Sequence, residues 1–199
     1  MYSEAINHLD LGANGLPYPI PIHPNLVHLT LGLFIIGIAF DVVGFLFPFG
    51  KPVFKYLSIP ATRSNFFDVG WYNMLASAII TFFTVTAGFY EIMLVNSPPE
   101  IESAWGLGAM ETMLWHGVGG VLLLTLIIAM TVWRGFDRYI WRNDTSCQVR
   151  LGYLLAGFAI MFLMYVHGTL GAQLAADFGV HNTAGHLLRM GENPNTLLR

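Results

Sequence analysis

Residues 26–49, LVHLTLGLFIIGIAFDVVGFLFPF, contain a single acidic side chain, Asp41, and no lysine or arginine. A helix needs roughly 20 predominantly apolar residues to cross the hydrocarbon core of a bilayer. Three further stretches of the chain meet the same requirement, namely 72–95, 113–133 and 151–174. We therefore predict an all-α integral membrane protein, a bundle of four transmembrane helices.

The composition agrees with a membrane protein. The 199 residues are 55% hydrophobic and only 11% charged, with a mean hydropathy of +0.58, whereas about a quarter of the residues are charged in a soluble domain. The net charge is -3 and no basic tract is present, which excludes nucleic acid as the expected partner. The single cysteine, Cys147, cannot form an internal disulfide.

The expected domain organisation follows from the four apolar stretches. Residues 1–25 form an extramembrane N-terminal segment, 26–174 the transmembrane domain and 175–199 an extramembrane tail. The N-terminal segment has no lysine or arginine, so it lacks the basic region of a secretory signal. Prolines are expected to mark the connections between the helices, and those concerned are Pro48, Pro52, Pro60, Pro98 and Pro99.

The basic residues predict the orientation. Seven of the nine lie between the first and second or between the third and fourth stretches: Lys51, Lys55, Arg63, Arg134, Arg138, Arg142 and Arg150. The other two, Arg189 and Arg199, follow the last stretch. Because basic residues accumulate on the cytoplasmic side, we expect both termini to lie outside, an N-out/C-out arrangement.

With this orientation, all seven histidines fall on the outer side. His28, His116 and His167 lie about 3, 5 and 10 Å below the outer ends of three different helices, at 1.5 Å per residue. The remaining four flank the outer ends: His8, His23, His181 and His186. The inner half of the membrane domain contains no histidine.

Each intramembrane histidine is followed four residues later by a glycine, and these glycines are Gly32, Gly120 and Gly171. Residues i and i+4 share one helix face, so each imidazole stands beside a patch without a side chain. Such patches give room for a flat macrocycle between helices. The alternative is that the glycines only allow the helices to approach closely.

His23 and His28 differ in their expected positions. Pro24 suits the first turn of a helix, which makes His23 a cap-like residue outside it. His28 lies one turn inside and can point into the bundle. Five positions place the two residues about 140° apart around the helix, so we do not expect them to bind one metal ion together. His23 is alternatively an ordinary interfacial residue.

Haem b is the cofactor that suits these histidines best. Zinc prefers four compact ligands, commonly including cysteine or a carboxylate, and no Cys–Met set that would indicate copper accompanies the histidines. Imidazoles from facing helices can take both axial positions of a haem in an apolar bundle. One or two haems are expected, with ligands drawn from His23, His28, His116, His167 and His181. Chlorophyll, with a single axial histidine, is the competing cofactor.

Three charged side chains complete the candidate site. Arg189 on the outer side is the expected partner of outward-pointing haem propionates. Glu91, at the level of the histidines, is expected to accept the second ring N–H of a ligand or a proton from quinol, unless it is an interfacial side chain that snorkels. Asp41, about 12 Å deep in its helix, is expected to be structural, with Asn73 and Tyr153 as hydrogen-bond partners.

Three segments resemble domain-of-unknown-function family 2231, a family of small bacterial membrane proteins: HPNLVHLTLGLFIIGIAFDVVG, MLWHGVGGVLLLTLI and HGTLGAQLAADFGV. That family opens on His-Pro-x-x-Val-His, with an acidic residue later in the first helix, matched by Asp41, and a histidine in the third, matched by His116. The resemblance covers residues 23–181. Ala172 and Phe178 replace a glycine and a histidine of the family pattern.

The resemblance also implies partners. Members of this kind occur beside terminal oxidase subunits of cyanobacteria, which implies an oxidase or a photosynthetic complex as a partner. It implies a bacterial plasma or thylakoid membrane as the location.

The function expected from these residues is electron transfer. Without ligands in the inner half, the chain is not expected to carry electrons across the membrane by itself. We predict a b-type cytochrome-like subunit with a bis-His haem near the outer face. It would oxidise quinol or relay electrons to other subunits of a membrane redox complex, rather than act as a stand-alone enzyme. The alternative is a cofactor-free or chlorophyll-binding accessory subunit.

Overall fold

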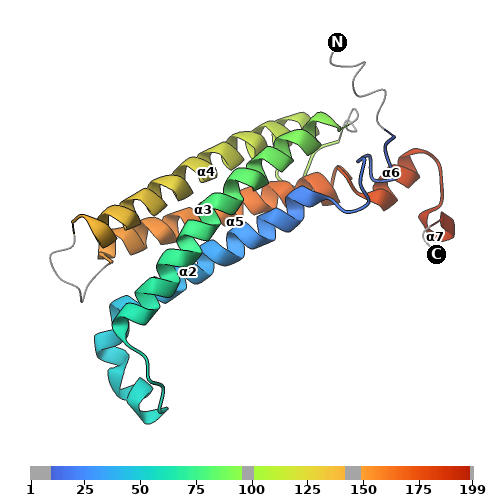
Figure 1. The fold of residues 1–199 in the computed structure, drawn as a ribbon. Helices are drawn as coiled ribbons and strands as arrows, with labels where there is room; N and C mark the ends of the chain where they lie inside the picture. Colours follow the sequence, from blue (N-terminus) through green and yellow to red (C-terminus); the bar gives the residue numbers. More distant parts are fainter. Residues whose placement is uncertain (1–9, 96–100, 142–148, 198–199) are drawn as a thin grey trace. The chain divides into compact units, whose positions relative to one another are not determined.

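The computed structural model describes residues 10–95, 101–141 and 149–197, except for the side chains of His186, Arg189 and Leu197. Its helices are α2 (Ile22–Tyr56), α3 (Arg63–Met93), α4 (Ala109–Tyr139), α5 (Leu151–Ala176), α6 (Thr183–Arg189) and α7 (Pro194–Leu197) (Figure 1). The first four are long and apolar enough to cross a membrane, and the described ranges contain no strand. The prediction of an all-α membrane protein with four spanning helices is confirmed.

The long helices extend beyond the apolar stretches, and α2 shows this most clearly. It continues through Pro48 and Pro52 to Tyr56, so the expectation that these two prolines mark a connection is wrong. A proline inside a helix removes one backbone hydrogen bond and bends the helix without always ending it. The C-terminal part of α2 is visibly bent in Figure 1.

The start of α2 also differs from the expectation. The helix begins at Ile22, so His23 and Pro24 belong to its first turn, and His23 is not a cap outside the helix. The N–H groups of a first turn have no partner within the helix, so Pro24 costs no hydrogen bond there.

The chain forms two compact units, which are described separately. The histidine unit comprises Met1–Asn25, Val85–Val121 and Tyr165–Arg199. The arginine unit comprises Leu26–Thr84 and Leu122–Met164. Each of the four long helices contributes residues to both units.

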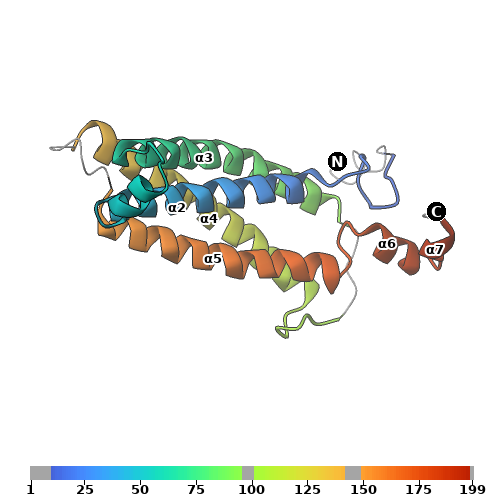
Figure 2. The ribbon, with the colours of Figure 1, turned by 90° about the horizontal axis from the view of Figure 1, so that it is seen from below.

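In the arginine unit, parts of all four long helices pack around one apolar core. Phe34 and Ile38 of α2, Met74 of α3 and Ile127 of α4 are buried in this core, and the helices lie alongside one another within the unit (Figure 2). Gly157 of α5 allows close packing, because a Cβ there would come within 2.5 Å of the Ile38 side chain.

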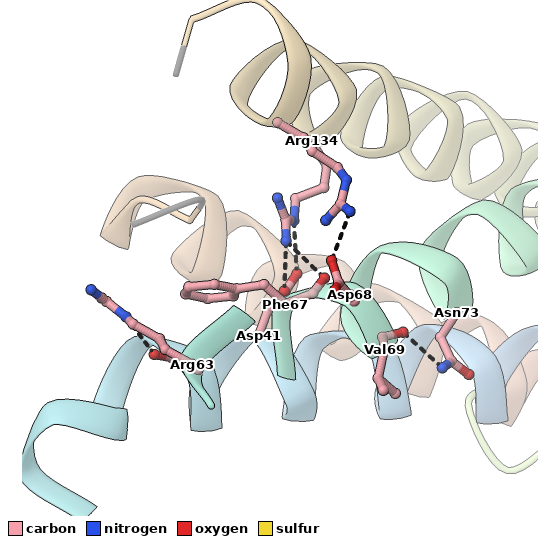
Figure 3. Close-up of polar contacts among 9 residues, drawn as sticks. Asp41, Arg63, Phe67, Asp68, Val69, Asn73 and Arg134 are labelled. Carbon is pink, nitrogen blue, oxygen red and sulfur yellow. Dashed lines mark hydrogen bonds and ion pairs between the residues drawn. The ribbon is translucent and has the colours of Figure 1, made fainter. Parts of the chain in front are cut away.

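A buried ion pair links α2 to α4 inside the arginine unit (Figure 3). Arg134 donates from Nε to Asp41 Oδ2 at 3.2 Å and from Nη2 to Asp41 Oδ1 at 3.1 Å. Both side chains are 0% exposed. Arg134 also donates to the carbonyl oxygen of Phe67 at 3.1 Å and lies over the Phe67 ring. The guanidinium therefore bridges three helices.

This pairing corrects two expectations. Asn73, the expected partner of Asp41, instead donates to the carbonyl oxygen of Val69 at 2.9 Å. Arg134 is not a loop residue, because α4 continues to Tyr139. Four further basic residues also lie within helices: Lys51 and Lys55 in α2, Arg63 at the start of α3 and Arg138 in α4. The predicted orientation stays a prediction.

Candidate functional site: a cluster of three histidines

Three imidazoles gather in the histidine unit, and we call them the three-histidine cluster: His23 of α2, His116 of α4 and His167 of α5. The rings of His116 and His167 are stacked, with centroids 4.1 Å apart and planes 5° apart. The rings of His23 and His116 are nearly perpendicular, with centroids 5.8 Å apart and planes at 88°. All three residues are partly buried. Residues far apart in the sequence thus form one continuous row of imidazoles.

Glycines on neighbouring helices make room for these rings. A Cβ at Gly88 of α3 would lie 2.8 Å from His23 Nδ1, and one at Gly119 of α4 would lie 2.7 Å from His167 Nδ1. A Cβ at Gly171 of α5 would lie 2.9 Å from His116 Cε1. Real Cβ atoms do not approach so closely, so these glycines admit the imidazoles themselves.

Two of the three glycines singled out in the sequence, Gly120 and Gly171, therefore face histidines of the opposite helix. Gly171, four residues after His167, lies against His116, and a Cβ at Gly120, four residues after His116, would lie 3.7 Å from His167 Cε1. Gly32 belongs to the arginine unit. A Cβ at Gly32 would meet no atom of the described residues within 4 Å.

Two ring nitrogens in the cluster lack hydrogen-bond partners. Nδ1 of His116 and Nδ1 of His167 are buried and make no hydrogen bond within the described part of the chain. Leaving a buried polar atom unsatisfied costs about 1–3 kcal/mol, so such atoms call for an explanation, for example the binding of a ligand or ion. Among the described residues, no group of three His, Cys, Asp or Glu side chains is arranged to hold a bare metal ion. The cluster thus has coordinating capacity without the geometry of a zinc site.

Glu91 of α3 fixes the start of α2 beside the cluster. Its Oε1 accepts hydrogen bonds from the hydroxyl of Tyr18 at 2.9 Å, the backbone N–H of Ile22 at 2.8 Å and that of His23 at 3.0 Å. A carboxylate is favoured at a helix N-terminus because it meets unpaired N–H groups and the positive end of the helix dipole. Glu91 is only 3% exposed, so it is not a snorkelling interfacial side chain.

Tyr18 strengthens this arrangement. Burial, together with the hydrogen bond and the charge of Glu91, raises the pKa of the Tyr18 phenol. The phenol therefore remains a neutral donor at physiological pH. Two expectations for Glu91 stay predictions. One is that its carboxylate accepts a proton from quinol, and the other is that it accepts the second ring N–H of a ligand histidine.

His181 lies beside Glu91, but its ring faces the backbone. Its Nε2 lies 2.9 Å from the carbonyl oxygen of Glu91 and its Nδ1 lies 3.4 Å from that of Asn14. Both ring nitrogens thus have backbone partners, and His181 ties the segment after α5 to α3 and the N-terminal segment.

The other candidate residues do not join the cluster. His28 belongs to the arginine unit, and its side chain is exposed rather than turned into the bundle. The side chain of Arg189 lies outside the described residues, as do His8 and the side chain of His186. Gly88 was not singled out from the sequence. The sequence feature that could have identified Gly88 is its spacing from Glu91. Gly88 lies three residues before Glu91 on α3, and residues at this spacing share one helix face.

We expect Glu91→Ala to loosen the start of α2, because it removes an acceptor shared by three donors. Loss of a helix cap costs about 1–2 kcal/mol. Amide hydrogen exchange, followed by mass spectrometry, should therefore accelerate about five- to thirtyfold in peptides covering residues 18–25. Tyr18→Phe is the matched control, since it removes one donor and leaves both backbone hydrogen bonds, and its effect should be clearly smaller. Unchanged exchange in Glu91→Ala would show that the carboxylate does not hold α2.

The comparisons with known proteins agree with this membrane fold. The model of a family described as "Predicted membrane protein (DUF2231)" matches residues 19–184. No curated protein and no solved structure matches the chain. The match spans α2 to α5 and includes all three histidines of the cluster. The chain therefore belongs to the DUF2231 family of membrane proteins.

Proposed function

We propose that the chain is a b-type cytochrome-like electron-transfer subunit, in which the three-histidine cluster holds haem b. The observation that carries the proposal is the meeting of three imidazoles from three membrane helices. Two of them have a buried ring nitrogen that lacks a hydrogen-bond partner among the residues that the structure describes. Haem b, when bound, supplies one-electron chemistry, and neutral imidazoles are its common axial ligands.

The ring separations support one pair of ligands over another. The rings of His116 and His167 are stacked with centroids 4.1 Å apart, which leaves no room for a metal between them, since each metal–nitrogen bond alone is about 2 Å long. The centroids of His23 and His116 are 5.8 Å apart. We therefore propose that His23 and His116 would hold the haem, with His167 packed against His116.

The surrounding residues position these ligands. Glu91 holds the backbone of His23 through the first turn of α2, and Gly88 and Gly171 leave space for the rings of His23 and His116. The location is proposed to be a bacterial plasma or thylakoid membrane, with a quinol or another subunit of a redox complex as the electron donor. Among the described residues nothing forms a complete catalytic centre, so turnover is proposed to require a partner such as a terminal oxidase.

A second candidate is an accessory subunit that holds no cofactor or binds chlorophyll. The observation that favours it is that the imidazoles already fill the space beside the glycines. In addition, the rings of His116 and His167 stack on one another. In that case the cluster is a packing element at the junction of α2, α4 and α5. Chlorophyll would need only one of the three imidazoles as an axial ligand.

The optical spectrum of the purified protein separates the candidates. For the cytochrome, reduction with dithionite should give a sharp low-spin α-band, and a pyridine assay should report haem b. A quinol analogue or the partner subunit should also reduce it. A folded, colourless preparation would favour the cofactor-free accessory subunit, and a chlorophyll spectrum would favour the pigment-binding one.

A further inference from the structure

The bent end of α2 brings two distant phenylalanines together. Phe47 and Phe54 are seven residues apart, which corresponds to about 10 Å along a straight helix, yet their ring centroids are 5.3 Å apart and stacked. Pro48 and Pro52 lie between these two phenylalanines, inside the helix. Prolines are the common cause of such bends. The bend therefore brings the end of α2, at Phe54, close to Phe47.

An open apolar groove of about 420 Å³ lies along this bend. Its lining includes Val43, Leu46, Phe47, Gly50 and Phe54. A Cβ at Gly50 would lie 3.3 Å from the Phe54 ring, so a larger side chain at position 50 would narrow the groove.

The groove lies at the depth where a membrane changes from hydrocarbon to headgroups. The 35 residues of α2 span about 50 Å, at 1.5 Å per residue, whereas the hydrocarbon core is about 30 Å thick. A span that begins near Leu26 therefore reaches the opposite boundary close to Leu46. The lining of the groove, which runs from Val42 to Phe54, would therefore straddle this boundary, with Lys51 and Lys55 on the headgroup side.

Positive charge follows the groove along the chain. Lys51 and Lys55, the only lysines of the chain, are exposed and lie four residues apart, a spacing that places residues on one helix face. No acidic residue occurs between Asp41 and Asp68. Arg63 adds a third positive charge in this region, with its Nε donating to the carbonyl oxygen of Gly44 at 2.9 Å.

We propose that this groove binds an anionic phospholipid. An acyl chain lies along the apolar lining formed by Leu46, Phe47 and Phe54, and the phosphate-bearing headgroup contacts Lys51 and Lys55. Lysine side chains can cover apolar surface with their methylene stems while their ammonium groups reach the headgroups. Basic clusters beside a membrane helix are suited to anionic lipids. The proposal is independent of any cofactor in the histidine unit.

Native mass spectrometry of the full chain in detergent tests this site. Phosphatidylglycerol and phosphatidylcholine with identical acyl chains are added in equal amounts. We expect preferential retention of phosphatidylglycerol. Each lysine near a headgroup contributes about fivefold in affinity, so Lys51→Gln/Lys55→Gln should weaken phosphatidylglycerol binding about thirtyfold. Lys51→Arg/Lys55→Arg should preserve it.

The groove itself is tested by Gly50→Leu, which should lower the retention of both lipids. Gly168→Leu is the matched control, because a Cβ at Gly168 meets no atom within 4 Å, and it should change neither. Equal retention of the two lipids, or no effect of the double glutamine variant, would overturn the proposal. So would a dimer mass in the wild type that Gly50→Leu abolishes, since the groove would then be a contact between two copies.

Discussion

Arg134→Met should lower the free energy of unfolding by about 3–5 kcal/mol, the cost of leaving one charge of a buried ion pair without its partner. Arg134 and Asp41 are both 0% exposed, and the remaining carboxylate would stay buried without the guanidinium that it pairs with. Loss of Arg134 also leaves the carbonyl oxygen of Phe67 without this donor. Unfolding can be followed by the intrinsic tryptophan fluorescence of the purified protein in detergent.

The double variant Asp41→Leu/Arg134→Met shows whether the charge or the packing matters. A buried ion pair replaced as a whole by apolar side chains of similar size often costs little stability, so the double variant should recover most of the loss. Arg138→Met is the control for removing an arginine from α4. Its partner Asp68 is 44% exposed, and such pairs are worth at most about 1 kcal/mol. Equal losses in Arg134→Met and Arg138→Met would contradict the role of the buried pair.

His116→Ala should abolish haem binding completely. His116 is the central ring of the cluster, since it contacts both His23 and His167. His167→Ala removes only the stacked ring, so a low-spin spectrum should survive in that variant, with weaker binding. The measurement is the ratio of haem to protein absorbance after purification.

His28→Ala is the matched control for His116→Ala. His28 is exposed and belongs to the arginine unit, so its removal should leave the haem content unchanged. Circular dichroism should show native helix content in both variants, so that loss of haem is not mistaken for unfolding. Haem loss in His28→Ala with retention in His116→Ala would exclude His116 as a residue that holds the haem.

The number and type of the helices were predictable because apolar length alone decides whether a segment can span a bilayer. The ends of the helices were not. Pro48 and Pro52 stand inside α2, where tertiary packing of Phe47, Phe54 and Phe66 accompanies the bend. Arg134 reads as a loop residue in a hydropathy profile, because its burial depends on a carboxylate from another helix.

The candidate site was predictable in part. His23, His116 and His167 were recognised from their residue type and depth, but their arrangement depends on contacts between helices that periodicity within one helix cannot give. The same limit explains the glycines. Gly171 was noted for its position relative to His167 on α5, whereas the structure places it against His116 of α4. Glu91 was singled out as an ionisable residue in a span, yet its three donors come from a different segment of the chain.

Electron paramagnetic resonance of the oxidised, purified protein tests the central proposal most directly, because imidazole ligands on both sides of a ferric haem would give a low-spin signal. We predict a low-spin ferric signal that is lost in His116→Ala and retained in His28→Ala. A high-spin signal alone would contradict ligation by two histidines, and the absence of any haem signal from folded protein would contradict the cytochrome proposal itself.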